Sequence, residues 1–244
     1  MPSPAHHNRV VYPERIVLFG SEGGFSRPVL ERLLSEGVSI AAVVMPGKKA
    51  TMRDASNGFP VAVEQVVSSS SLAGLAAAHD LPVLAVSDLN DHRLTEELLK
   101  LGADILLVAC FPWKLPRAIW HEQRSGCWNL HPSLLPRYRG PAPLFWQLHY
   151  RERNTGVTLH EVSEHLDAGD IVAQASRALP TNTSAAALDE WVAEVGVDLF
   201  VKALDHYRRG CLVTSPQNEA AASYFPRPSR MRSYTRPSAG LEPI

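Results

Sequence analysis

The sequence predicts an α/β protein built on an open, mainly parallel sheet. Two short apolar runs, at residues 15–20 and 38–44, flank an amphipathic segment that starts near Ser26. This strand–helix–strand order implies parallel strands, because a helical crossover returns the chain in the same direction. The apolar run at 104–109 is typical of another buried strand. Ligands of such sheets bind at the carboxyl ends of the strands, so a functional site is expected there.

Two helices have recognisable ends. Pro28 fits the first turn of a helix that starts at Ser26, and Gly37 fits its end. The longest helix is expected to follow Thr183 or Ser184, either of which can cap it. Its apolar positions predict a buried face made of Leu188, Trp191, Val192, Val195, Leu199 and Ala203.

Shorter elements follow from the same patterns. Helices are expected at 72–79, after a cap at Asn90 or Asp91, and in the aromatic segment after Pro141. Strands are expected at 81–86, 126–130, 157–162 and 171–175, the last two paired with each other.

The chain is expected to divide into two parts. Residues 13–180 would form the catalytic domain, and 181–244 a C-terminal helix and partly flexible tail packed on or following that domain. Residues 1–12 are expected to form a loose leader, and residues 46–70 a polar surface loop that contains glycine and ends in a run of serines. The end from about residue 230 has the composition of a flexible tail.

Composition narrows the class of protein. The chain has 244 residues, of which 45% are apolar and 20% are charged, as in globular proteins. It lacks an apolar run of about 20 residues and an apolar signal core, so we expect a cytoplasmic protein without a membrane span. Three cysteines without a C-x-x-C pattern predict neither disulfides nor a zinc site. A net charge of −1 does not favour nucleic acid as the main ligand.

The informative segment lies at residues 129–141, just after a predicted buried strand. Asn129 and His131 are two positions apart, so their side chains point to the same side of an extended chain. Pro132 and Pro136 stiffen the loop after His131. A second polar cluster, Leu-Asp-Ala-Gly-Asp at residues 166–170, lies in a glycine turn between two predicted strands.

These two motifs carry a family resemblance. Asn-x-His-Pro-Ser-Leu-Leu-Pro, followed by Leu-Asp-x-Gly-Asp, resembles the folate-dependent formyltransferases, which include enzymes acting on methionyl-tRNA, glycinamide ribonucleotide and amino sugars. The resemblance covers about residues 14–175 and is specific from 126 to 175; residues 224–228 match more weakly. It implies a Rossmann-like formyltransferase fold, a transferase activity and 10-formyltetrahydrofolate as the co-substrate.

The resemblance also implies a catalytic triad of Asn129, His131 and Asp167. An amine attacks the formyl carbon, and the oxyanion that forms needs a fixed donor, which the Asn129 amide supplies. His131 donates a second hydrogen bond or moves a proton, because imidazole titrates near neutral pH. Asp167 orients and charge-stabilises His131, or accepts the amine proton through water.

Folate contacts are implied at two places. Ser133, Leu134, Leu135 and Pro136 would line the folate site, and Phe111 and Trp113 would border the pterin. Ordinary packing is the alternative for the two aromatic residues. Arg137 and Arg139 would meet acidic groups on the folate tail or the acceptor, or lie in a solvated loop. His160 and His165 could suggest a metal, but their strand spacing does not bring them together, so no metal is expected.

The acceptor is inferred by elimination. The tRNA enzymes of the family carry a further C-terminal barrel, whereas about 70 residues follow the core here. The glycinamide ribonucleotide enzymes have a different first loop. A small amine remains, such as a nucleotide-linked amino sugar, with no membrane partner and with a homo-oligomer left open. The alternatives are a methionyl-tRNA formyltransferase-like enzyme without the tRNA-binding barrel, a 10-formyltetrahydrofolate hydrolase, and a folate-binding module without activity.

Overall fold

The computed structural model describes residues 12–47, 68–121, 126–180 and 183–228. Most of the predicted leader and loop, and the whole of the tail predicted from about residue 230, lie outside these residues. Tyr12, assigned to the leader from the sequence, is instead the first residue of a strand.

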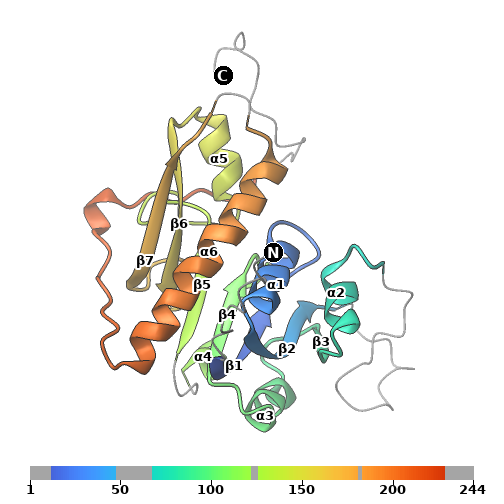
Figure 1. Cartoon of the computed structure of the whole chain (residues 1–244). Helices are drawn as coiled ribbons and strands as arrows, with labels where there is room; N and C mark the ends of the chain where they lie inside the picture. Colours follow the sequence, from blue (N-terminus) through green and yellow to red (C-terminus); the bar gives the residue numbers. More distant parts are fainter. Residues whose placement is uncertain (1–11, 48–67, 122–125, 181–182, 229–244) are drawn as a thin grey trace, which may run out of the picture.

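The core is a seven-stranded sheet with the order β3-β2-β1-β4-β5-β6-β7 (Figure 1). Its strands are β1 (Tyr12–Phe19), β2 (Val38–Pro46), β3 (Val83–Val86), β4 (Ile105–Ala109), β5 (Cys127–His131), β6 (Asn154–Glu161) and β7 (Ile171–Ala178). The pairings among β1 to β5 are all parallel, whereas β6 is antiparallel to β5 and β7 is antiparallel to β6. This arrangement confirms the predicted open, mainly parallel α/β sheet.

Helices cover both faces of the sheet. One face packs against α1 (Ser26–Ser35), α2 (Leu72–Ala78) and α6 (Ala185–Arg208). The opposite face packs against α3 (His92–Lys100) and α4 (Arg117–Trp120), of which α4 is absent from the elements expected from the sequence. The short helix α5 (Pro143–His149) contributes to a smaller apolar cluster together with α6. A 3₁₀ turn, η1 (Glu219–Ala221), follows α6.

Side-chain caps begin three of the helices. Ser71, Asp91 and Ser184 accept hydrogen bonds from backbone amides in the first turns of α2, α3 and α6. Ser26 has a different task, because it is the buried first residue of α1 and not its cap. Its hydroxyl donates to the carbonyl of Ala109 at 2.6 Å, which ties the start of α1 to the end of β4.

The buried face of α6 is rotated from the predicted one. Leu188, Val192 and Ala203 are buried as expected, but Trp191, Val195 and Leu199 are only partly buried. The centre of the face is Gly196, where an added Cβ would lie 3.2 Å from the Leu130 methyl groups and 3.5 Å from a Val157 methyl. The missing side chain of Gly196 therefore lets α6 lie close to the sheet.

The chain after α6 returns to the sheet and contacts both motif segments (Figure 1). Ser215 pairs with Ile171 through two backbone hydrogen bonds, of 2.8 and 2.9 Å. Further on, the Arg139 amide donates to Ser223 and the Phe225 amide donates to Arg139, at 2.8 and 2.9 Å. The segment therefore belongs to the folded core up to its last described residue. The predicted boundary between residues 180 and 181 stays a prediction.

A separate feature concerns membranes. In the parts of the chain that the structure describes, no helix combines the length and the apolar character needed to cross a bilayer.

Candidate active site

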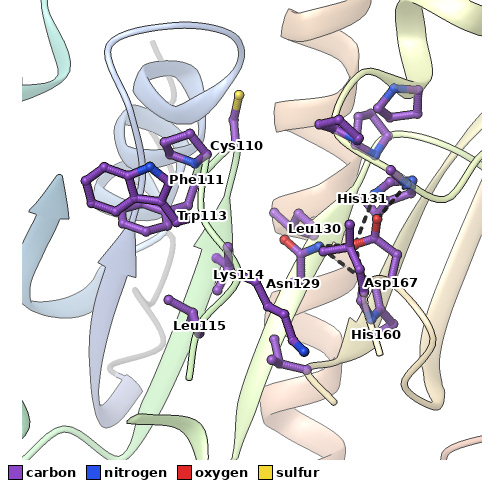
Figure 2. A pocket seen from close by; sticks show the side chains of 18 of the residues that line it. Cys110, Phe111, Trp113, Lys114, Leu115, Asn129, Leu130, His131, His160 and Asp167 are labelled. Carbon is purple, nitrogen blue, oxygen red and sulfur yellow. Dashed lines mark hydrogen bonds and ion pairs between the residues drawn. The ribbon is translucent and has the colours of Figure 1, made fainter. Parts of the chain in front are cut away.

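The two predicted motifs meet at the carboxyl ends of β4 and β5. Asn129 and His131 lie on β5, and Asp167 lies in the turn between β6 and β7. Their side chains line one cavity of about 590 Å³ (Figure 2). The segment that follows β4, residues 110–115, forms part of its wall. The structure thus brings together the three residues expected from the resemblance; their catalytic roles remain a prediction.

His131 is held by the backbone. Its Nε2 lies 2.8 Å from the carbonyl oxygen of Tyr138. A carbonyl only accepts, so Nε2 carries the hydrogen, and in the neutral ring the lone pair sits on Nδ1. Nδ1 lies 3.7 Å from Oδ1 of Asp167. The sequence-based prediction gave the orienting role to Asp167, but the Tyr138 carbonyl makes the shorter contact.

His160, which the sequence analysis considered only as a metal ligand, has a different place in the site. It is buried on β6, directly opposite Asn129 in the antiparallel register. Its Nδ1 lies 2.8 Å from the Glu161 carbonyl, so this nitrogen carries the hydrogen. Its Nε2 therefore accepts from Nδ2 of Asn129, at 3.0 Å.

Burial keeps His160 neutral. Loss of solvent lowers the pKa of its imidazole to about 4, although the negative charge of Asp167 acts in the opposite direction. A neutral ring with an unprotonated Nε2 fixes which way the Asn129 amide points. One hydrogen of Nδ2 is engaged by His160, and the other faces Oδ1 of Asp167 at the long distance of 3.5 Å. That second hydrogen is the one free to bind a ligand oxygen.

The two carboxylate oxygens of Asp167 have different partners. Its Oδ2 accepts from the Gly140 amide at 2.8 Å, whereas Oδ1 faces Nδ1 of His131 and Nε2 of His160 at 3.7 and 3.8 Å. The side chain is 8% exposed, so it acts in surroundings where charge interactions are poorly screened. One oxygen is thus a fixed anchor and the other faces the cavity.

Two glycines make this geometry accessible. Gly140 has φ +116°, and an added Cβ would lie 2.1 Å from the Phe225 carbonyl oxygen. At Gly169 an added Cβ would lie 1.9 Å from the carbonyl oxygen of Glu161. Both distances are far shorter than any van der Waals contact, so any other residue would displace Asp167 or its anchor.

Gln217 fastens the turn that carries Asp167. It is buried, and its Nε2 donates to the carbonyls of Asp167 and Gly169 at 2.9 and 2.7 Å. Its Oε1 accepts from Nε and Nη2 of Arg139, at 3.1 and 2.7 Å. Asp167 has φ +54°, a strained conformation for a residue other than glycine, so these bonds hold the backbone where it would not stay unaided. Arg139 therefore acts inside the fold, which differs from its expected role toward a ligand's acidic groups.

The predicted folate contacts separate into two groups. Phe111 and Trp113 line the cavity and contact each other edge to face, with ring centroids 5.7 Å apart. Figure 2 shows both of them on the wall opposite His131. Large apolar side chains continue around the opening, where Leu166 and Tyr224 are exposed by 42% and 58%. A flat heterocycle fits such a wall.

The loop residues of the second group point elsewhere. Ser133, Leu134, Leu135 and Pro136 are absent from the residues lining this cavity. Ser133 and Leu135 are buried, and Leu134 packs on Gly156 of β6. The hydroxyl of Ser133 donates to the Arg137 carbonyl, and the Leu135 amide donates to Thr158. In this structure they shape the loop after His131, and the cavity lining lends no support to direct folate contact.

In the described residue ranges, no group of three or more His, Cys, Asp or Glu side chains is arranged to hold a metal ion. His160 and His165 both line the cavity.

The fold and the site together define an α/β protein with an Asn–His–Asp cavity at its strand ends, and comparison with known proteins identifies the family. The formyl transferase family model matches residues 14–204. The chain therefore belongs to the formyltransferase family.

One similar curated protein is the methionyl-tRNA formyltransferase of Halalkalibacterium halodurans. It is 33% identical over 216 residues, which make up 88% of this chain and 65% of that protein. The chain spans between 63% and 65% of the length of this and two further methionyl-tRNA formyltransferases.

Two solved structures share the fold at lower identity. HypX from Aquifex aeolicus in complex with tetrahydrofolic acid has a TM-score of 0.62 and 20% identity, covering 88% of this chain and 30% of HypX. The N-formyltransferase from Helicobacter canadensis in complex with folinic acid and dTDP-3-aminofucose has a TM-score of 0.59 and 21% identity, covering 89% and 71%.

Replacing Gln217 tests whether it holds the turn that carries Asp167, and the test needs no assay of activity. We expect Gln217→Ala to lower the free energy of unfolding by about 1–3 kcal/mol, because two carbonyls and the Arg139 guanidinium lose a buried partner. Chemical denaturation would measure this loss. Glu219→Gln is the control, since it changes an exposed partner of the same arginine and leaves Gln217 in place. Equal stabilities of the two variants would show that Gln217 does not fasten the turn.

Proposed function

We propose that this protein transfers a formyl group from 10-formyltetrahydrofolate to the amine of a small acceptor. The observation that carries the proposal is the convergence of three different groups on one cavity. Nδ1 of His131 and the second amide hydrogen of Asn129 both face Oδ1 of Asp167, at 3.7 and 3.5 Å, and all three residues line the cavity. Together they offer a base, a donor and a negative charge.

The proposed step assigns one task to each group. The amine nitrogen of the acceptor forms a bond with the formyl carbon, and the Asn129 amide hydrogen binds the resulting oxyanion. Nδ1 of His131 takes the proton that the amine loses and returns it to the folate nitrogen as the carbon–nitrogen bond breaks. No electrons are exchanged, and no covalent bond to the protein forms.

Asp167 stabilises the protonated His131 in this mechanism. Two unit charges about 4 Å apart attract by about 4 kcal/mol at an effective dielectric constant of 20. The observed Nδ1–Oδ1 distance of 3.7 Å lies in this range. Because Gly140 anchors the other carboxylate oxygen, the negative charge stays in place as the imidazole becomes charged.

The aromatic wall of the cavity supports the choice of folate. Phe111 and Trp113 provide apolar surface for the pterin, and Tyr224 and Leu166 extend it toward solvent. The Helicobacter canadensis and HypX structures, which share this fold, contain folinic acid and tetrahydrofolic acid. Lys114, which also lines the cavity, is a cation suited to an acidic group of the folate.

For the acceptor we propose a small amine, such as a nucleotide-linked amino sugar. The Helicobacter canadensis protein binds dTDP-3-aminofucose, and this chain covers 71% of it. A methionyl-tRNA formyltransferase-like activity is the second candidate, because the curated relatives at about 33% identity carry that name. Formate release without any amine would point instead to a 10-formyltetrahydrofolate hydrolase.

Folate binding can be measured before the acceptor is known. Isothermal titration calorimetry with 5-formyltetrahydrofolate should give a saturable signal, and Trp113→Ala should weaken it by about tenfold, since base–aromatic contacts contribute about 1–3 kcal/mol. Tyr150→Ala removes another exposed aromatic residue that does not line the cavity, so it should bind as the unchanged protein does. No binding at millimolar analogue by folded protein would rule out the proposed donor.

Substitutions in the triad should act on rate more than on folate affinity. Asn129→Ala, His131→Ala and Asp167→Ala should each lower kcat about a hundredfold or more, because each group acts mainly on charge that develops after attack. The His131–Asp167 double variant should lose clearly less than the product of its single losses, since the two act as one unit. Release of tetrahydrofolate measures kcat, and calorimetry measures the affinity for the folate analogue. Folded variants with near-normal kcat would contradict the mechanism.

A further inference from the structure

A second cavity adjoins the catalytic one. It measures about 530 Å³ and lies between the turn after β1, the start of α5 and the start of α6. Phe25, Cys110, Phe111 and Arg227 line both cavities, so the two are adjacent compartments along one wall. A ligand in the second cavity would therefore lie beside the cavity that contains the catalytic groups.

The second cavity is mostly apolar and contains two charged side chains. Prolines, phenylalanines and small residues form most of its wall. In the described part of the chain, its charged lining residues are Asp189, from the second turn of α6, and Arg227, from the returning C-terminal segment. An apolar chamber with one acid and one base is suited to a ligand that offers a polar donor and an acidic group.

Asp189 has no visible structural task. Among the described residues, none forms a hydrogen bond or an ion pair with its carboxylate. Burial alone raises the pKa of Asp189, to about 6. Its charge also acts on Cys110, whose pKa is raised first by burial and further by the Asp189 carboxylate, which places the acid toward the junction of the two cavities.

The stability of the fold would be better served by another residue. A carboxylate that loses solvent without gaining a partner makes folding less favourable, and by more than a neutral asparagine or an apolar residue in the same place would. Carboxylates that are partly buried without a protein partner are typical of binding sites, because there the ligand supplies the missing partner.

We propose that the second cavity holds the body of the acceptor, and that Asp189 determines specificity by accepting hydrogen bonds from hydroxyl groups of a sugar-like amine. This inference rests on the proposed function, since it assumes that the amine reaches the catalytic cavity. Arg227 binds the acidic group of the same acceptor, such as the phosphate that links a sugar to a nucleotide. A second ammonium group is disfavoured as the partner of Asp189, because Arg227 already places a positive charge in the cavity.

The test compares two acid-to-amide variants of neighbouring residues. Asp189→Asn changes the cavity, whereas Glu190→Gln changes an exposed acid that lines neither cavity. Binding of dTDP-3-aminofucose and of glucosamine 6-phosphate is measured by calorimetry on protein saturated with 5-formyltetrahydrofolate. Cyclohexylamine serves as an amine without hydroxyl or acidic groups.

We expect Asp189→Asn to weaken binding of at least one hydroxylated amine by about tenfold, which corresponds to about 1.4 kcal/mol. Its affinity for the folate analogue and for cyclohexylamine should not change, and Glu190→Gln should match the unchanged protein throughout. With an acceptor that is turned over, KM should rise while kcat stays within about twofold. Equal behaviour of the two variants, or no binding of either hydroxylated amine to the unchanged protein, would overturn the inference.

The outcomes separate this inference from the proposed function. Binding that depends on Asp189 without any release of tetrahydrofolate would refute formyl transfer but keep the ligand site. Formyl transfer that is unchanged in Asp189→Asn would support the proposed function but refute the role of Asp189 in acceptor binding.

The melting temperature gives a second readout, with a definite sign. In the unfolded chain Asp189 ionises near its ordinary value of 3.8, whereas in the folded protein it stays protonated up to about 6. Stability therefore falls as pH rises between these values, and remains lower above them. Asp189→Asn should melt higher than the unchanged protein at pH 8, with the difference lost near pH 4. Both proteins retain Arg227 and Cys110, the other titratable groups of this cavity. A difference that does not depend on pH would mean that Asp189 is solvated and poorly placed to bind a ligand.

Discussion

The carboxylate of Asp167 joins segments that are far apart in the chain. Oδ2 accepts from the Gly140 amide, and Oδ1 faces His131, His160 and the Asn129 amide. The backbone of the same residue is held by Gln217, which follows α6. Each of these contacts depends on the turn between β6 and β7 being in place, so the geometry of the whole cavity depends on where this one carboxylate sits.

Strain at the site is offset by the surrounding structure. Asp167 and Tyr138 have φ values of +54° and +62°, and such conformations cost on the order of 1–3 kcal/mol for residues other than glycine. At Tyr138 the strained backbone aims a carbonyl at Nε2 of His131, and at Asp167 it aims the carboxylate at Nδ1. The hydrogen bonds of Gln217 and the pairing of residues 223–225 with Arg139 keep both turns in shape. Groups held in this way need little reorganisation as charge develops.

Local patterns predicted the elements, but not what they bring together. The two-residue spacing of Asn129 and His131 was sufficient to place both on one side of β5, and the family motif added Asp167. The sequence analysis considered His160 only as a metal ligand and missed its contact with Asn129, because the two meet only through the β5–β6 register, which no local pattern contains. Gln217 and Asp189 were missed for a similar reason, since a long helix and a return segment bring them to the site. The buried face of α6 differs from the predicted one because α6 packs closely on the sheet at Gly196, a residue that the pattern of apolar side chains leaves out of that face.

The hydrogen positions on the two histidines test the central claim most directly. Nitrogen-15 NMR of the imidazoles at pH 7, with His131→Gln and His160→Gln used for assignment, reports which ring nitrogen carries the hydrogen. The account predicts hydrogen on Nε2 of His131 and on Nδ1 of His160, with His160 remaining neutral down to about pH 5, since its pKa is lowered to about 4. Hydrogen on Nδ1 of His131, or a His160 that titrates near pH 6.5, would contradict it, because neither a free base nor a fixed Asn129 amide would then face the cavity.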